Sequence, residues 1–265
     1  MNDQNPYQAP DANVVKARQV TADGLAVSGI KAMPISAGWT WLVEGFSLFT
    51  KSPLIWIIIC IIGFAINLVS QFIPIVGPIA ISLLYAVFFA GFLYGCAALD
   101  NNESLEVGHL FAGFSRRTSP LIGLGLAYLI ITILFAIVFF VMAFFVIGGA
   151  AIFENMSNLE NINPAEFFTP GLLLLFLLVF ALSIPFVMLF WFAPALVALG
   201  EEPVMDSLKL SLKGCLKNIL PLFVYSIVWL VLAVIASLPL FLGWFVLAPV
   251  TLASFYTAYR SIYTG

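Results

Sequence analysis

The amino-acid sequence predicts an all-α, polytopic membrane protein with about six transmembrane helices, arranged as three hairpins that each follow an interfacial amphipathic helix. Two observations carry this prediction: the composition, and the position of the few charges. The 265 residues are 63% hydrophobic and only 9% charged, against roughly 45–50% and 25% in an ordinary soluble domain. Because a soluble fold could not bury that much apolar surface, the sequence indicates a chain that lies mostly in lipid.

Four charge-free blocks predict the number of spans. Each block lies between two charged residues: Lys51 and Asp100, Arg117 and Glu154, Glu166 and Glu201, and Lys217 and Arg260. A helix that crosses the hydrocarbon needs about 20 apolar residues, so the first and last blocks hold two spans each and the middle two hold one each. Pro/Gly clusters divide the first and last blocks. The predicted spans are near 53–72, 78–99, 120–148, 170–199, 219–237 and 241–260.

The basic residues predict the orientation, because membrane insertion leaves Lys and Arg in cytoplasmic segments. All ten lie in the segments that a six-span chain places on one side of the membrane. They are Lys16, Arg18, Lys31, Lys51, Arg116, Arg117, Lys209, Lys213, Lys217 and Arg260. We therefore expect both termini in the cytoplasm.

The chain divides into residues 1–34, which we expect to be a disordered cytoplasmic tail, and residues 35–265, the six-span transmembrane domain. The tail is polar and shows no sustained hydrophobic period. Its Asn5, Pro6 and Tyr7 are either a short recognition motif for a protein partner or only a turn. The formal net charge of -3 is too small and too dispersed to indicate a nucleic-acid partner.

An amphipathic stretch precedes each predicted hairpin, and each stretch leads into a proline followed by leucine. Apolar residues recur in these stretches at helical spacing, with polar residues on the opposite face. We interpret this pattern as an internal triplication; chance similarity among apolar helices is the alternative. The repeat units are about 36–99, 103–199 and 203–260.

Small residues and prolines mark places where helices pack or bend. Gly91 and Gly95 offer a surface for close helix approach, and we favour packing within the chain over a homodimer. Pro185 and Pro194 each remove a backbone donor and predict a kink in the fourth span, which either fits the bundle or gates a path.

Four short stretches resemble a known group of proteins. They are Ala37-Gly38-Trp39, Leu110-Phe111-Ala112-Gly113-Phe114, Ser207-Leu208-Lys209-Leu210-Ser211 and Tyr256-Thr257-Ala258-Tyr259-Arg260-Ser261-Ile262-Tyr263. Over nearly the whole chain after the tail, the sequence resembles the YciC-like bacterial multi-pass inner-membrane proteins, which are related to the membrane domain beside some glycerophosphodiester phosphodiesterases. The resemblance implies a six-span fold in the bacterial inner membrane. It carries over no catalytic residue.

The motifs of familiar enzymes and metal sites do not occur in the sequence. His109 is the only histidine, and with Glu106 it forms Glu-x-x-His, which in di-iron bundles needs a second copy that this chain lacks. We therefore expect no metal, no cofactor and no enzyme activity, and we interpret His109 as a polar-face or headgroup-contacting residue.

Apart from Arg260 at the end of the sixth, the predicted spans contain no carboxylate, lysine, arginine or histidine, although ion-coupled transport usually needs such groups at membrane depth. Asn67 and Gln71 lie four residues apart and share one helix face. They form a possible intramembrane polar cluster, which serves either hydrogen bonding between helices or a substrate site.

Two function classes follow from these patterns. The first is a membrane scaffold or lipid-organising protein, whose interfacial helices lie at the headgroups beside anionic lipid. The second is a transporter or channel for an apolar or amphipathic small molecule or lipid. The possible headgroup contacts are Lys209, Lys213, Lys217, Arg116 and Arg117.

Overall fold

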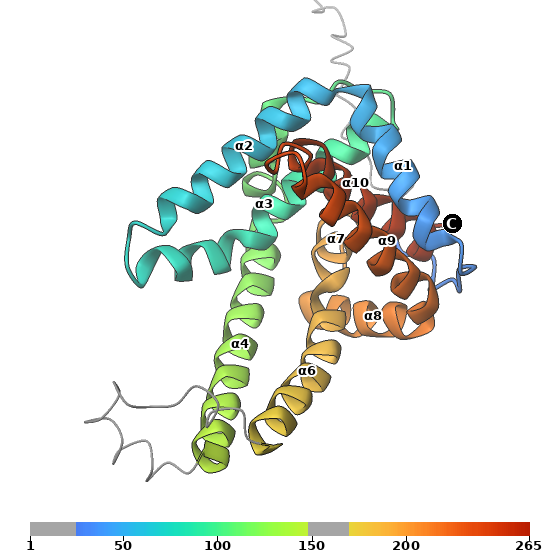
Figure 1. The fold of residues 1–265 in the computed structure, drawn as a ribbon. Coiled ribbons are helices and arrows are strands. Elements are labelled where there is room, and N and C mark those ends of the chain that lie inside the picture. The colour runs from blue at the N-terminus through green and yellow to red at the C-terminus, as the bar shows by residue number, and fades with distance from the viewer. Residues whose placement is uncertain (1–24, 148–169) are drawn as a thin grey trace, which may run out of the picture.

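The computed structural model describes residues 25–147 and 170–265, and every regular element in those two ranges is a helix. Figure 1 shows the α2–α3 pair and the α4–α6 pair extending away from a packed region that contains α1, α7 and α10. In chain order the elements are α1 (Ala37–Lys51), α2 (Pro53–Ser70), α3 (Val76–Asp100), the 3-10 helix η2 (Val107–Phe114), α4 (Thr118–Ile147), α6 (Pro170–Trp191), α7 (Ala193–Ala198), α8 (Val204–Lys217), α9 (Ile219–Ser237) and α10 (Trp244–Tyr263).

Five of the predicted spans coincide with helices that are long and apolar enough to cross a membrane. By length and composition, these candidate membrane spans are Pro53–Ser70, Val76–Asp100, Thr118–Phe145, Leu173–Ala198 and Ile219–Ser237. The predicted sixth span, 241–260, falls on α10, which is not among them. Five candidate spans are therefore found in the part of the chain that the structure describes, and a sixth crossing stays a prediction.

The surroundings of α10 explain its more polar composition. The helix packs against α1, α2, α3 and α9, and many of its residues are buried. Its hydroxyl groups bond to neighbouring helices: Ser254 Oγ lies 2.7 Å from Tyr225 Oη, and Trp229 Nε1 donates to Thr251 Oγ1 at 2.8 Å. A helix whose polar groups are satisfied by protein neighbours does not need the composition of a lipid-exposed span.

The first short helix, α1, is buried on one side, although the sequence predicts a helix that lies on the membrane surface. Trp41 and Phe49 are buried in the core, where α1 packs mainly on α10. Trp39, Val43 and Phe46 lie on the other side and are about half exposed, at 55%, 47% and 50%. The apolar residues of α1 therefore serve two surfaces, because hydrophobic spacing does not distinguish a lipid neighbour from a protein neighbour.

The second short helix, η2, packs very closely on α3. A Cβ atom added to Gly91 would lie 2.3 Å from the carbonyl oxygen of Leu110, and one added to Gly113 would lie 2.1 Å from the carbonyl oxygen of Val87. Backbones approach this closely only where the side chain is a hydrogen atom. A Cβ on Gly95 would meet the side chain of Leu105 at 2.7 Å, so this glycine pair serves packing within the chain.

Each short helix packs on the second helix of another pair. α1 packs mainly on α10, η2 on α3, and α8 on α6 and α7, while α3, α7 and α10 also contact one another. If the chain is an internal triplication, this is the arrangement expected of three units in a ring, in which the first unit packs against the last. The superposition of the three units stays a prediction.

A buried hydroxyl group occupies the break between α6 and α7. α6 continues through Pro185 and ends before Phe192, and Pro194 lies in the first turn of α7. Phe192 N–H donates to Ser211 Oγ at 2.9 Å, and Ser211 Oγ donates to the Met188 carbonyl at 2.7 Å. The Ser211 hydroxyl thus bridges the two backbone groups that an uninterrupted α-helix would join directly.

Residues 25–34 follow the ends of α8 and α10, although the sequence assigns them to the disordered tail. Ser28 N–H donates to the Tyr263 carbonyl at 2.9 Å, and this carbonyl lies in the last turn of α10, where intrahelical donors are missing. The buried side chain of Asn218 accepts the N–H of Met33 at 2.8 Å. The described end of the predicted tail is therefore bound to the helices.

Candidate functional site

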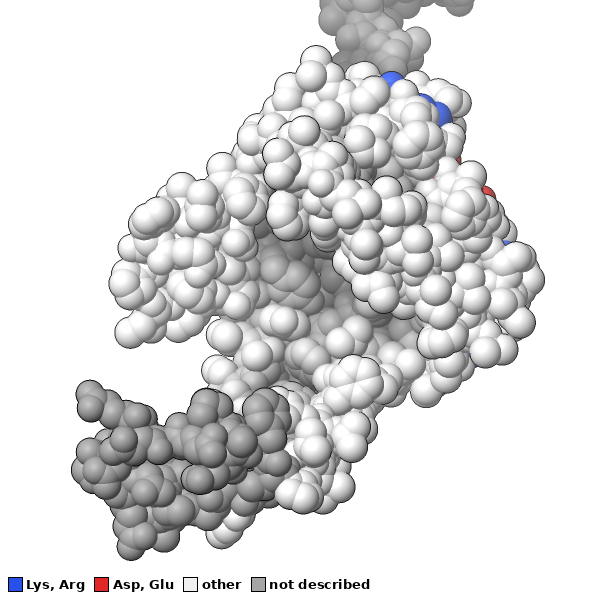
Figure 2. Space-filling model, viewed as in Figure 1, with Lys and Arg blue, Asp and Glu red and all other residues white. Residues whose placement is uncertain are grey.

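Few charged side chains lie on the face of the molecule that Figure 2 shows. Figure 2 shows a broad face of uncharged residues over the long helices, with a few acidic and basic side chains at its upper right rim. An ionised group is costly in hydrocarbon, so the uncharged part suits the membrane and the charged end suits its surface. Two cavities of about 470 Å³ each are lined by charged side chains.

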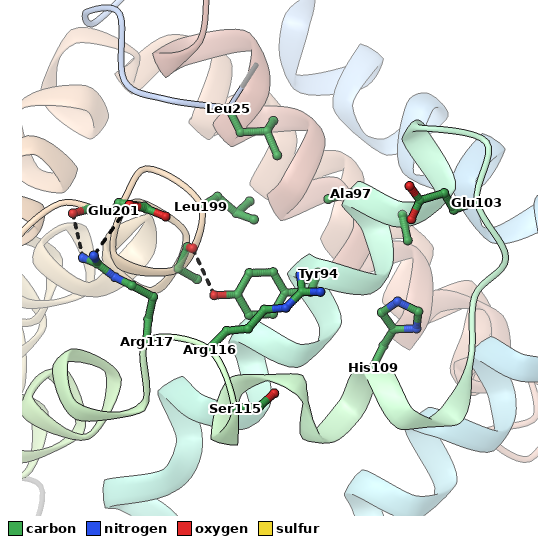
Figure 3. A pocket seen from close by; sticks show the side chains of 12 residues that line it. Leu25, Tyr94, Ala97, Glu103, His109, Ser115, Arg116, Arg117, Leu199 and Glu201 are labelled. Atoms are coloured by element: carbon green, nitrogen blue, oxygen red, sulfur yellow. Dashed lines mark hydrogen bonds and ion pairs between the residues drawn. The ribbon is translucent and has the colours of Figure 1, made fainter. Parts of the chain in front are cut away.

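The first of these cavities, which we call the arginine cavity, is formed by segments that lie far apart in the sequence (Figure 3). Its walls come from the C-terminal half of α3, the loop before η2, η2 itself, and the turns before α4 and after α7. Its polar lining residues are Tyr94, Glu103, His109, Ser115, Arg116, Arg117 and Glu201.

Arg117 joins two turns of the chain at one wall of the arginine cavity. Its Nη2 donates to the Glu201 carbonyl oxygen at 2.6 Å, and its Nη1 lies 3.8 Å from Glu201 Oε2. Both residues adopt left-handed backbone conformations, with φ of 55° and 56°, which cost a non-glycine residue about 1–2 kcal/mol. The buried Nε of Arg117 has no hydrogen-bond partner in the part of the chain that the structure describes.

Arg116 lies over an aromatic ring. Its guanidinium carbon is 5.2 Å from the ring centroid of Tyr94, at the distance of a cation–π contact. The Tyr94 hydroxyl donates to the Ala198 carbonyl at 3.0 Å, which fixes the ring between α3 and the end of α7. The Arg116 guanidinium therefore lies against a ring whose own position is fixed by this hydrogen bond.

His109 and Glu103 lie on the other side of the cavity (Figure 3). The Glu106 N–H donates to His109 Nδ1 at 3.0 Å, in a reciprocal capping arrangement at the start of η2. His109 Nδ1 also lies 3.1 Å from the Glu106 carbonyl oxygen, so the tautomer decides whether it accepts from the backbone or donates to it. The Glu-x-x-His pair thus caps a helix, and no group of three or more potential metal ligands occurs in the described ranges.

The second cavity lies beside a cluster of ion pairs that joins α1, α3 and α10. Arg260 Nη1 donates to Asp100 at 2.6 Å, and its Nη2 lies 3.4 Å from Glu44 Oε2. The hydroxyl of Tyr256 also donates to Asp100, at 2.9 Å. Since these charges already bond to one another, we interpret this cluster as structural and take the arginine cavity as the candidate site.

The predicted headgroup contacts separate in space. Arg116 and Arg117 lie together in the arginine cavity. The three lysines lie on the exposed side of α8: Lys209 pairs with Asp206 at 3.2 Å, and Lys217 Nζ donates to the Ile30 carbonyl. Lys213 is exposed. Contact of any of these side chains with lipid stays a prediction.

The predicted polar cluster of Asn67 and Gln71 lies at the exposed end of α2, and no hydrogen bond joins the two side chains. Asn67 lines a largely apolar groove of about 330 Å³ between α2, α3 and α10. The same groove contains Tyr85, whose buried hydroxyl has no partner among residues 25–147 and 170–265. The tail residues Asn5, Pro6 and Tyr7 lie outside those ranges.

Sequence reasoning missed Tyr94, Glu103 and Glu201 as members of the site. In the sequence, Glu201 marks only the end of a charge-free block, and Tyr94 lies inside a predicted span. The one available signal is that Glu103 and Glu201 lie in the loops that follow α3 and α7. Only the packing of α3 against α7 and η2 brings them together.

Comparison with known proteins gives a family and one relative. The family model described as a domain of unknown function, DUF7847, matches residues 40–262. A probable inner membrane protein of Burkholderia thailandensis is 28% identical over 203 residues, which cover 74% of this chain and 73% of that protein. No solved structure matches. The link to YciC-like proteins and to phosphodiesterase membrane domains stays a prediction.

Proposed function

We propose, from the premise that this chain belongs to the DUF7847 domain family, that it is a non-enzymatic protein that organises lipids or serves as a scaffold in the bacterial inner membrane. The candidate spans and the relative named as an inner membrane protein make it a multi-pass membrane protein. The observation that carries the lipid role is the arginine cavity, which presents two guanidinium groups at the charged end of the membrane helices.

Charge and exposure support a role at the membrane surface. On the sequence-based topology, the charged end faces the cytoplasm, where anionic headgroups attract basic side chains by about 1 kcal/mol each. Arg116 and Lys213 have no ion-pair partner within residues 25–147 and 170–265, so their charges are available to headgroups. The exposed Trp39 and Phe46 of α1 present an apolar surface that suits the interface.

Native mass spectrometry of the full chain in lipid nanodiscs tests this proposal. We expect Arg116→Gln combined with Arg117→Gln to remove tightly retained lipid, because phosphate loses its charge-assisted donors. The variant with Lys209, Lys213 and Lys217 all replaced by Gln should keep this lipid and lose only the enrichment of anionic lipid around the protein. Retained lipid and enrichment that are unchanged in both variants would contradict a lipid-organising role.

The alternative is a transporter or channel for an apolar or amphipathic small molecule or lipid. A largely apolar groove of about 420 Å³ favours it; Trp191, Tyr225, Trp229 and Phe255 line this groove between α6, α9 and α10. Protein reconstituted in vesicles should then move a fluorescent lipid between leaflets, and Trp229→Ala should change the rate. If the lipid moves no faster than in protein-free vesicles, the result would speak against transport of that lipid.

A further inference from the structure

We infer that the arginine cavity binds a zwitterionic group in which a phosphate is joined to a primary ammonium, the chemistry of a phosphoethanolamine headgroup. The inference rests on the proposed lipid role and names the ligand of the same site. It distinguishes this ligand from a purely anionic headgroup and from one with a quaternary ammonium.

The charges that line the cavity balance in sign. Arg117 and Glu201 bond to each other, through the carbonyl contact at 2.6 Å and the ion-pair distance of 3.8 Å. This leaves Arg116 and Glu103, which form no ion pair within the described ranges. A ligand with one negative and one positive group complements both, whereas a purely anionic ligand complements only Arg116.

The phosphate end of the ligand lies at the arginines. A cation–π contact is not a hydrogen bond, so the contact with Tyr94 leaves the N–H groups of Arg116 available to phosphate oxygens. Arg117 lies beside it and is already bonded to Glu201, so it adds positive charge to this wall rather than a free donor. Phosphate supplies several acceptor oxygens, and a guanidinium is the side chain best matched to them.

The ammonium end lies at Glu103. Figure 3 shows Glu103 and His109 on the side of the cavity away from Arg117 and Glu201, with Arg116 and Tyr94 between the two sides. A primary ammonium donates up to three hydrogen bonds, as a lysine side chain does, and a carboxylate accepts them. A quaternary ammonium has no N–H group, so it would leave the Glu103 carboxylate without a donor.

The remaining wall and the size of the cavity suit the rest of a headgroup. Leu25, Ala97 and Leu199 supply apolar surface for the two methylene groups that join phosphate and ammonium. The volume of about 470 Å³ lies within the usual range for small-molecule sites, about 300–1,000 Å³. The same chemistry occurs in a membrane lipid and in a soluble phosphoethanolamine ester, and the experiment separates these sources.

The experiment measures lipid retention by the full chain. Nanodiscs contain equal amounts of phosphatidylethanolamine, phosphatidylglycerol and phosphatidylcholine, and native mass spectrometry identifies the lipid that stays bound. We expect the unmodified protein to retain phosphatidylethanolamine about tenfold over the other two, which is the effect of one well-made charged contact. Glu103→Gln should shift the preference to phosphatidylglycerol, and Arg116→Gln should lower retention of both lipids.

Lys213→Gln is the matched control, because this exposed charge lies on α8 and outside the cavity lining. It should leave the preference unchanged. Glu103 is also exposed, so a thermal unfolding scan should show that Glu103→Gln remains folded. A preference for phosphatidylethanolamine that persists in folded Glu103→Gln would overturn the inference, as would equal retention of all three lipids by the unmodified protein.

Two further outcomes separate this inference from the proposal beneath it. Retention of phosphatidylglycerol alone by the unmodified protein would overturn the inference and leave the lipid role standing, whereas retention of no lipid would overturn both. A second arm adds glycerophosphoethanolamine to lipid-depleted protein in detergent. Binding that Glu103→Gln weakens supports the chemistry in a soluble source, and binding of the intact lipid alone supports a membrane source.

Discussion

Replacement of Ser211 by alanine should destabilise the protein by about 2–3 kcal/mol, because the Ser211 hydroxyl bridges the break between α6 and α7. The side chain is fully buried. Without it, the Phe192 N–H loses the acceptor at 2.9 Å and the Met188 carbonyl loses the donor at 2.7 Å. Each buried polar group left without a partner costs about 1–3 kcal/mol. The Met188 carbonyl keeps a weak contact with Cys215 Sγ at 3.6 Å, so the sum lies in the lower half of the range.

Thermal unfolding in detergent measures this effect. The three cysteines are free, and those at positions 96 and 215 are buried, so a thiol-reactive dye reports the loss of structure as these thiols become exposed. We expect Ser211→Ala to lower the Tm by about 5–10 °C, by the usual relation between free energy and Tm for a domain of this size.

Ser226→Ala is the matched control for this measurement. The Ser226 hydroxyl is exposed and donates only to the Leu222 carbonyl of its own helix, at 2.9 Å. Its removal should change the free energy of unfolding by less than about 0.5 kcal/mol. Equal Tm values for the two variants would refute the reasoning, because they would show that the α6–α7 break needs no bridging hydroxyl.

Three other changes have expected outcomes. Gly91→Ala should cost about 1–3 kcal/mol in unfolding free energy, because its Cβ would meet backbone oxygens of η2 at 2.3 and 2.6 Å; Gly63→Ala, whose nearest contact would be 3.5 Å, should cost much less, and equal Tm losses would contradict this. Burial raises the pKa of Cys215 from 9.0 to about 12 by disfavouring the thiolate. In a variant without the other two cysteines, alkylation by iodoacetamide should therefore not rise through pH 9 while the protein is folded, and a rise centred there would show an accessible thiol. Reporter fusions after Asn161 should indicate the periplasm and fusions after Arg117 the cytoplasm; a cytoplasmic signal at Asn161 would exclude the six-span topology.

The membrane class and five of the helices could be predicted from the sequence, because a span depends on local properties. A stretch of about 20 apolar residues without charge is expensive in water wherever it lies in the fold. The predicted first five spans accordingly coincide with candidate membrane helices. The break at Pro194 was also accessible, since proline lacks the donor that a continuous helix needs.

The neighbours of these helices were decided only by tertiary structure. α10 has hydroxyl side chains that bond within the protein, and α1 has apolar residues that face both α10 and the outside. A periodic pattern records that one face is buried, and it does not record what buries it. The sequence likewise assigned residues 25–34 to the tail. Their hydrogen bonds go to groups more than 180 residues away, which no local pattern records.

The arginine cavity shows most clearly which features the sequence predicts and which depend on tertiary structure. The Arg116-Arg117 pair was visible in the sequence as two basic residues between two predicted spans. Its neighbours in the cavity, Tyr94, Glu103 and Glu201, were not, because a ring contact and a carbonyl acceptor carry no local signature. The sequence by itself determined which segments are apolar enough to enter the membrane, through the free energy of moving apolar groups out of water. The tertiary structure decided which charges meet at its surface, since that depends on the packing of helices about a hundred residues apart.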